Sequence, residues 1–157
     1  MPQQSARRRA THTKFQRPQV GVGIIISKEK QVLLIKRSNA HGEGTWAPPG
    51  GHLEYGESPQ QCAIREAQEE AGVTIINPVF RAITNDVFEQ ERRHYLTVWM
   101  EGTYVSGEPT VQSPRELSAV DWFPWDALPE PLFLPFEHLL TGQCDPAPWN
   151  FSEDEEF

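Results

Sequence analysis

The chain has 157 residues, with 14 Lys or Arg, 22 Asp or Glu and a formal net charge of −8. This length suits one domain that buries its own core, and no apolar run is long enough to cross a membrane. The two cysteines, Cys62 and Cys144, are too few for a disulfide framework or a cysteine-based zinc site, which favours a reducing compartment such as the cytoplasm. The excess of acid also argues against binding to the backbone of a nucleic-acid polymer.

Both ends of the chain are predicted to be flexible tails of opposite charge. Residues 1–18 hold five basic side chains and no acid, whereas residues 145–157 hold five acids and no base. The two tails cancel, so the net charge belongs to residues 19–144, which we predict to be the folded domain. An Arg-rich, acid-free N-terminus is also typical of a mitochondrial presequence, an alternative that stays open although the segment lacks an apolar face.

The hydrophobic pattern of the body predicts a mixed α/β domain with one long helix among strands. The first two strands are joined by a polar hairpin turn at residues 27–31. We expect strands at 20–26, 32–35, 79–88, 94–104 and 120–123, a loop at 38–51 and a short helix within 132–140.

The long helix has clearly marked ends. Ser58 is a typical N-cap, Pro59 suits the first helical position, Gln61 completes a capping box, and Gly72 provides the stop. At 100° per residue, small and apolar side chains collect on one face between these ends, and glutamates collect on its flank. We therefore predict a helix over residues 59–71 that packs by one face and carries carboxylates beside it.

Three glutamates of this helix, Glu66, Glu69 and Glu70, are related by spacings of three and four and so lie within about one turn of each other. For an arbitrary sequence the simplest interpretation is a solvated acidic face, relieved by an i,i+4 pair between Arg65 and Glu69. The upstream context favours a cation site, because residues 50–73 carry five Glu against one Arg and begin with two glycines. Carboxylate and carbonyl oxygens are hard ligands that select Mg²⁺, Mn²⁺ or Ca²⁺.

From Gly51 the chain reads GHLEYGESPQQCAIREAQEEAGV, which matches every fixed position of the pattern G-x5-E-x7-R-E-U-x-E-E-x-G-U, where U is apolar. This pattern is the Nudix box, and the chain resembles the Nudix hydrolases. The similarity extends from about Pro18 to Pro146, where VGVGIII, PPGGHLEYGES, RRHYLTVWMEG and ALPEPLFLPFEHLL resemble segments of small cytosolic MutT-type members that act on nucleoside triphosphates. The resemblance implies the Nudix fold, an α/β fold with a mixed β-sheet sandwiched between helices.

The resemblance also implies a metal site. Glu66 and Glu70 resemble the central metal ligands, Glu69 resembles a further ligand, and the Gly50 carbonyl resembles another. The implied cofactor is Mg²⁺, with Mn²⁺ as a substitute. An acidic site can accept a polyphosphate only when bound cations neutralise the phosphate charge, so metal dependence is expected.

Catalytic roles follow from the same resemblance. Arg65 resembles the arginine that orients the catalytic glutamates, and Glu57 resembles the loop carboxylate that fixes the loop to the helix. In relatives the general base is either the equivalent of Glu66 or a glutamate elsewhere. Glu116, six residues before Trp122, resembles a loop glutamate that supplies a further metal ligand or the base. Its alternative is an exposed loop charge, because similar relatives place their glutamates one or more positions earlier.

Four residues are candidates for substrate binding: Arg37, Gly51, His52 and Phe133. Arg37 resembles an arginine that reaches the substrate phosphates, although a basic residue at a strand end is usually solvated. His52 lies where relatives share a histidine, for which a structural hydrogen bond is the alternative. The segment around Phe133 resembles the lining of the base pocket, whereas most aromatic side chains simply belong to the core.

The sequence therefore predicts a metal-dependent enzyme that hydrolyses a nucleoside triphosphate, including oxidised or noncanonical deoxynucleotides, to the monophosphate and pyrophosphate. One alternative is a pyrophosphatase for ADP-ribose, NADH or another nucleoside diphosphate linked to a second group. Another is a Nudix module that binds nucleotides without hydrolysing them. The expected partner is a small nucleotide rather than a nucleic-acid polymer or a membrane. Because relatives are often dimers, a homodimer is an open alternative.

Overall fold

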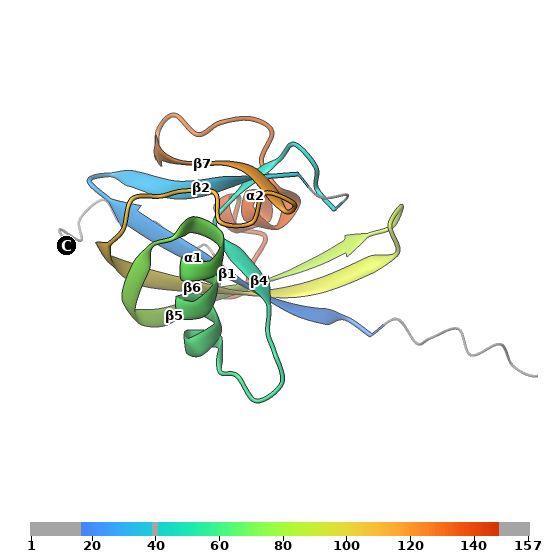
Figure 1. Ribbon diagram of the computed structural model, residues 1–157. Coiled ribbons are helices and arrows are strands. Elements are labelled where there is room, and N and C mark those ends of the chain that lie inside the picture. Colours follow the sequence, from blue (N-terminus) through green and yellow to red (C-terminus); the bar gives the residue numbers. More distant parts are fainter. Residues whose placement is uncertain (1–16, 39–40, 148–157) are drawn as a thin grey trace, which may run out of the picture.

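The structure, a computed structural model, describes residues 17–38 and 41–147 (Figure 1). The predicted tails at 1–18 and 145–157 fall almost entirely outside these residues. Asp145, which the sequence analysis assigns to the acidic tail, exchanges two backbone hydrogen bonds with Ile83, at 2.9 and 3.0 Å. Neither helix within the described ranges is long and apolar enough to cross a membrane.

The predicted order of strands and helices is confirmed, with longer strands than expected. The elements are β1 (Gln19–Lys28), β2 (Gln31–Arg37), β3 (Trp46–Ala47), β4 (Gly50–His52), α1 (Pro59–Ala71), β5 (Thr74–Phe88), β6 (Arg93–Ser106), β7 (Leu117–Pro124) and α2 (Leu134–Leu140).

The predicted loop at 38–51 is wrong in part, because it contains β3 and most of β4. Composition favoured a loop, but tertiary pairing with neighbouring strands decides the backbone here. Gly50 and Gly51 pair with Gly23 and Val22 of β1. A Cβ at Gly50 would lie 2.4 Å from the Val22 carbonyl oxygen, so only glycine permits this approach.

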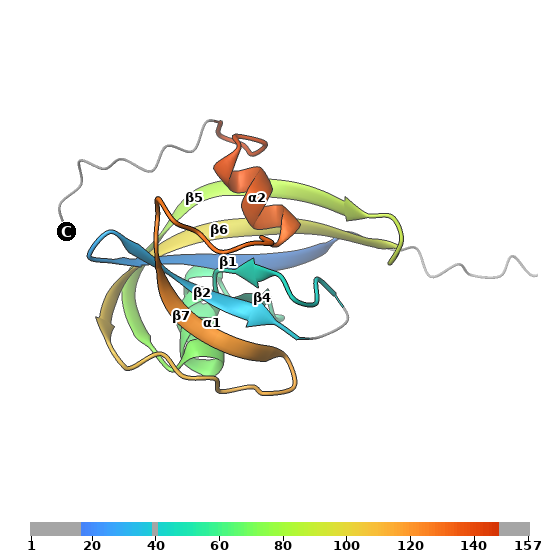
Figure 2. The same cartoon turned by 90° about the horizontal axis from the view of Figure 1, so that it is seen from above.

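The sheet is mixed and divides along its middle. Its strand order is β3-β2-β1-β6-β5, with β4 paired to β1 and β7 paired to β2. β1 and β6 run parallel along most of their length, whereas β1 meets β2 only where Ser27 and Lys28 face Val32 and Gln31. Beyond these residues β2 and β7 diverge from β1 (Figure 2). The divergence leaves room between the two halves of the sheet.

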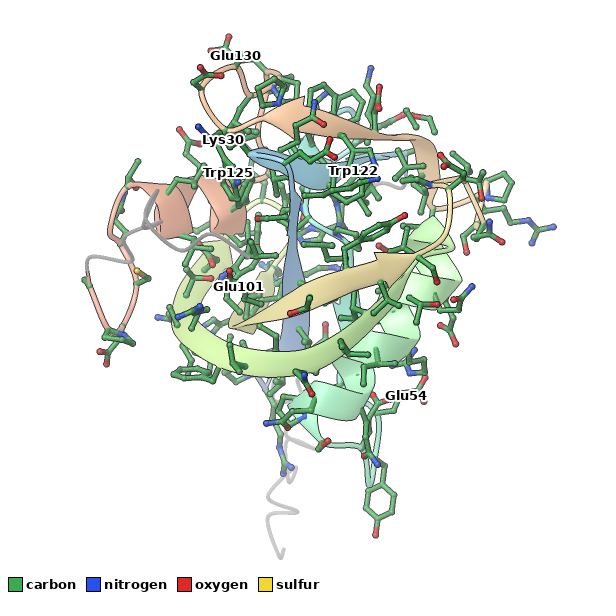
Figure 3. All side chains as sticks on the ribbon, turned by 90° about the vertical axis from the view of Figure 1, so that its left-hand side faces the viewer. Lys30, Glu54, Glu101, Trp122, Trp125 and Glu130 are labelled. Carbon is green, nitrogen blue, oxygen red and sulfur yellow. The ribbon has the colours of Figure 1, made fainter. Side chains whose placement is uncertain are left out.

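Each face of the sheet packs against its own helix. Alternate residues of β1 point to opposite sides: Ile24 and Ile26 join the core around α1, and Ile25 joins the core around Phe136 of α2. Side chains fill the space on both sides of the central strands (Figure 3). This arrangement confirms the predicted mixed sheet sandwiched between helices.

Helix α1 begins and ends as predicted. The Ser58 side chain accepts a hydrogen bond from the Gln61 N–H at 3.1 Å, and the Gln61 side chain accepts one from the Ser58 N–H at 2.9 Å. Gly72 ends the helix in the left-handed conformation, with φ of 69°. A capped start of this kind stabilises a helix by about 1 kcal/mol and fixes which residues face the sheet.

Candidate active site

A cavity of about 390 Å³ opens where β1 and β2 separate, bounded by α1 on one side and the start of α2 on another. Among the predicted site residues, only Glu57 does not line it. The predicted residues that line the cavity are Arg37, Gly50, Gly51, His52, Arg65, Glu66, Glu69, Glu70, Glu116 and Phe133. The fold thus brings candidates from five separate segments of the chain to one concave surface.

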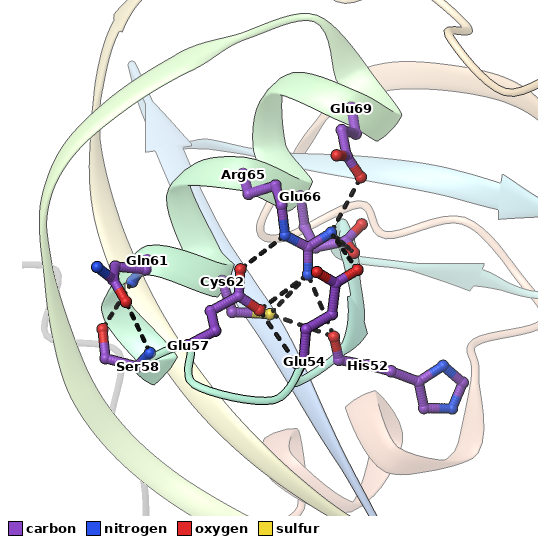
Figure 4. Close-up of polar contacts among 9 residues, drawn as sticks. All are labelled: His52, Glu54, Glu57, Ser58, Gln61, Cys62, Arg65, Glu66 and Glu69. Carbon is purple, nitrogen blue, oxygen red and sulfur yellow. Dashed lines mark hydrogen bonds and ion pairs between the residues drawn. The ribbon is translucent and has the colours of Figure 1, made fainter.

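Arg65 connects the loop before α1 to the glutamates of the helix (Figure 4). Its guanidinium donates to both carboxylate oxygens of Glu57, at 2.7 and 2.9 Å. The same group donates to Glu66 at 2.7 Å, to Glu69 at 3.0 Å and to the His52 carbonyl at 3.2 Å. A planar, bidentate guanidinium fixes the geometry of its partners, which a lysine could not do.

The ion pair between Arg65 and Glu57 shifts the pKa values of its two members in opposite directions. Hydrogen bonds from Arg65 lower the pKa of Glu57 to about 2, so the Glu57 carboxylate is ionised throughout the neutral range. The same pair raises the pKa of Arg65 above its ordinary value. Glu57 does not line the cavity, and both oxygens of its carboxylate accept hydrogen bonds from Arg65.

Glu66 and Glu70 are the buried members of the acidic stripe, each about 8% exposed. Burial raises the pKa of Glu66 to about 7 and that of Glu70 to about 8. The Gly50 N–H donates to the Glu70 carboxylate at 3.1 Å. A Cβ on Gly51 would lie 2.3 Å from Oε1 of Glu66, so the missing side chain makes room for that carboxylate. By contrast, the Glu69 side chain is 58% exposed.

The residues present fit a divalent cation. Within residues 17–38 and 41–147, no group of three or more His, Cys, Asp or Glu side chains converges tightly enough to form a metal site by itself. Mg²⁺, however, is usually held by one or two carboxylates and is completed by waters and substrate phosphates. Glu66 and Glu70 supply two buried carboxylates; burial raises their pKa values, and a nearby cation would favour their ionised, ligating form. Glu116 adds an exposed carboxylate on the same cavity.

Basic and aromatic side chains line another part of the cavity. The Arg37 guanidinium lies 4.2 Å from the centre of the Phe133 ring, and burial lowers the pKa of Arg37. Phe133 is held beside the cavity by a 2.8 Å hydrogen bond from its N–H to the Trp46 carbonyl. The His52 ring contacts the Tyr95 hydroxyl at 3.3 Å. A guanidinium beside an aromatic ring suits a ligand that carries both phosphates and a flat base.

Sequence reasoning missed two residues of this part of the cavity, His41 and Tyr95. Both line the cavity, and their rings lie 5.2 Å apart. Tyr95 lies in the strand predicted at 94–104, and His41 lies in the loop predicted at 38–51. Their proximity depends on a contact between segments distant in sequence, for which the sequence carries no local signal. Cys62 is buried and its pKa is raised to about 12, which agrees with a packing role.

The comparisons with known proteins agree with this geometry. A model of the family described as NUDIX domain matches residues 17–140. The chain is 33% identical over 92 residues to the Nudix hydrolase YvcI of Bacillus subtilis, covering 59% of this chain and 56% of the relative. It is 35% identical over 106 residues to the NAD-capped RNA hydrolase NudC of Pseudomonas aeruginosa, covering 68% of this chain and 36% of the relative. The chain thus spans roughly half or less of the length of these curated relatives.

A crystal structure of a MutT NUDIX hydrolase from Burkholderia pseudomallei superimposes with a TM-score of 0.70 at 32% identity. The match covers 74% of this chain and 90% of that one. Other relatives are named ADP-ribose pyrophosphatase and 8-oxo-dGTP diphosphatase, so the names of the relatives refer to different substrates. The family model covers most of the chain, the fold matches, and five of the nine fixed box residues line one cavity. The chain therefore belongs to the Nudix family of hydrolases.

Proposed function

We propose that the protein hydrolyses a nucleoside triphosphate to the monophosphate and pyrophosphate, with a divalent cation, Mg²⁺ or Mn²⁺, as cofactor. The observation that carries this proposal is the pair of buried carboxylates, Glu66 and Glu70, facing a cavity that also holds Arg37 and Phe133. Acidic and basic groups on one cavity suit a ligand that arrives with both a cation and phosphates. The oxidised or noncanonical deoxynucleotides remain one option within this substrate class.

The residues of the chain have distinct roles in this proposal. A bound divalent cation would neutralise phosphate charge and make a water molecule more acidic. Glu66, a carboxylate on the cavity wall beside the cation, is placed to accept a proton from the attacking water. Arg65 holds the Glu66 carboxylate in position, and Glu57 in turn holds Arg65. Arg37 is placed to contact phosphate oxygens.

The size of the cavity supports a mononucleotide over a dinucleotide. About 390 Å³ is at the low end of the range for small-molecule sites. A pyrophosphatase for ADP-ribose or NADH is the second candidate, because an ADP-ribose pyrophosphatase is matched over 69% of its length. A non-catalytic sensor is disfavoured by the complete box.

The test is a panel of nucleoside triphosphates, ADP-ribose, NADH and NAD-capped RNA, assayed with Mg²⁺ and with chelator. Pyrophosphate released only with Mg²⁺ supports the proposal, since the dinucleotide substrates yield two monophosphates instead. Glu66→Gln should lower kcat by at least about 100-fold while thermal unfolding stays cooperative. Glu69→Gln, at an exposed neighbouring site, is the matched control and should lower kcat much less than Glu66→Gln does. Full activity in the Glu66 variant would remove that residue from the mechanism.

The remaining parts of the proposal concern location and assembly. Cys62 and Cys144 are both free thiols, a state that a reducing cytoplasm preserves. Absence of binding to membranes and to nucleic-acid polymers stays a prediction, and so does the homodimer. Light scattering of the full chain measures the oligomeric state directly.

A further inference from the structure

His41 lies among aromatic side chains at the cavity. Its ring is edge-on to Phe88 at 4.4 Å and to Phe133 at 5.4 Å, and it is tilted against Tyr95 at 5.2 Å. The His41 side chain is 12% exposed. Phe88 and Tyr95 come from β5 and β6, whereas Phe133 precedes α2, so three separate segments enclose one imidazole.

The two nitrogens of this imidazole are in different situations. Nδ1 is hydrogen-bonded to the carboxylate of Glu91, in the turn between β5 and β6. Nε2 is buried and has no hydrogen-bond partner among the residues that the structure describes. A carboxylate only accepts hydrogen bonds, so Nδ1 carries the proton and Nε2 of the neutral ring is left as an acceptor. Burial also lowers the pKa of His41, in keeping with a neutral ring.

A buried acceptor without a partner is unfavourable, and proteins rarely leave one at a cavity without a use. The rings around His41 favour a flat, aromatic ligand over a sugar hydroxyl, which prefers polar surroundings. Nε2 is closed off from solvent, so access of a ligand to this atom requires an adjacent ring to move. Phe133 is the apolar ring best placed to do so, because it lines the cavity and its movement breaks no side-chain hydrogen bond.

We propose that His41 determines base specificity, with Nε2 accepting a hydrogen bond from an amino group of the substrate's nucleobase and Glu91 positioning the ring. This inference rests on the proposed function, because it concerns the nucleoside part of the same substrate. The class of ligand is a nucleotide whose base carries an exocyclic amino group. Glu91 acts through His41 and does not touch the ligand.

Binding of nucleoside monophosphates to the full chain tests the proposal without requiring hydrolysis. Two pairs differ only in one amino group: GMP against IMP, and AMP against purine riboside monophosphate. Calorimetry with Mg²⁺ should show the amino-bearing member of at least one pair binding about five- to tenfold more tightly, the worth of one hydrogen bond. His41→Phe keeps the ring and removes the acceptor, so the ratio should fall to about one. His94→Phe, outside the cavity, should leave it unchanged.

The role of Glu91 has its own pair of variants. Glu91→Gln retains an amide oxygen that accepts the Nδ1 proton, so the amino preference should survive. Glu91→Ala frees the ring to carry its proton on Nε2, which then donates instead of accepting, and the preference should fall. The kcat for a triphosphate should stay unchanged in both variants while KM changes only for alanine. These variants carry the test if His41→Phe fails to fold.

Several outcomes overturn the inference. It fails if the wild type binds none of the four monophosphates, if neither pair shows a preference, or if His41→Phe preserves one. It also fails if Glu91→Ala and Glu91→Gln behave alike. Its failure is distinct from that of the proposed function: release of pyrophosphate without an amino preference removes only the role of His41. A preference for the amino-bearing nucleotide without any turnover supports the role of His41 and contradicts the proposed hydrolysis.

Discussion

The two buried carboxylates should make the metal-free protein less stable as the pH rises. Burial raises the pKa of Glu66 to about 7 and of Glu70 to about 8, from an ordinary value of 4.5. A group whose pKa is raised in the folded state stabilises the fold fully below its unfolded pKa, and this stability is lost as the pH rises through the folded pKa. The free energy of unfolding without metal should therefore decline between about pH 5 and pH 8.

The magnitude follows from the pKa values. One pKa unit corresponds to about 1.4 kcal/mol, so a rise from 4.5 to about 7 costs roughly 3 kcal/mol at Glu66 and a rise to about 8 costs roughly 5 kcal/mol at Glu70. The charge on Glu66 is itself one cause of the raised pKa of Glu70. The two contributions therefore overlap, and the pair costs less than their sum.

Glu70→Gln isolates one of these contributions, because glutamine keeps an oxygen for the Gly50 N–H and carries no charge. In chelator, denaturant titration should find this variant within about 1 kcal/mol of the wild type at pH 5 and roughly 3 to 5 kcal/mol more stable at pH 8. For a domain of this size, each kcal/mol of this difference raises Tm by about 2 to 4 °C. Excess Mg²⁺ should reduce the gap at pH 8 by stabilising only the wild type. A stability difference that does not vary with pH would refute the reasoning.

Three further predictions concern Gly51, the two cysteines and the metal. Gly51→Ala places a Cβ 2.3 Å from the Glu66 carboxylate, so kcat should fall at least about 10-fold with circular dichroism unchanged; an unaffected kcat contradicts the close approach. Cys62, whose pKa is raised to about 12, should resist thiol reagents until the protein unfolds, whereas half-buried Cys144 should react first, as peptide mass spectrometry measures. Mg²⁺ should bind more tightly when a nucleotide is present, which paired calorimetric titrations test; equal affinity would separate the two binding events.

The acidic helix could be predicted because its signals are local. The cap at Ser58, the stop at Gly72 and the spacing of the glutamates all lie within one short segment, so helix geometry alone places the carboxylates together. The unequal burial of Glu69 and Glu70 was not predicted. It depends on which face of α1 lies against β4 and on the Gly50 N–H that reaches Glu70, and both are tertiary contacts.

The part of the cavity beside His41 could not be predicted for the same physical reason. His41 and Glu91 are 50 residues apart, and their hydrogen bond forms only because the turn between β5 and β6 reaches the loop after β2. The short strand β4 was missed because three residues of mostly glycine have no strand propensity, and pairing with β1 alone makes them extended. Spacing patterns report local geometry, whereas pairing across the fold leaves no comparable signal.

The net charge of −8 acquires a structural meaning in this cavity. Arg65 donates to Glu57, Glu66 and Glu69 and forms an ion pair with Glu54 at 3.7 Å, so one cation is shared among four carboxylates. Glu70 accepts a hydrogen bond from the Gly50 N–H. Ionising Glu70 at this buried position is therefore costly without a ligand, which is why burial raises its pKa to about 8. A cation removes that cost and at the same time creates the positive charge that a polyphosphate requires. The acidity of the chain therefore excludes phosphate ligands only in the absence of metal.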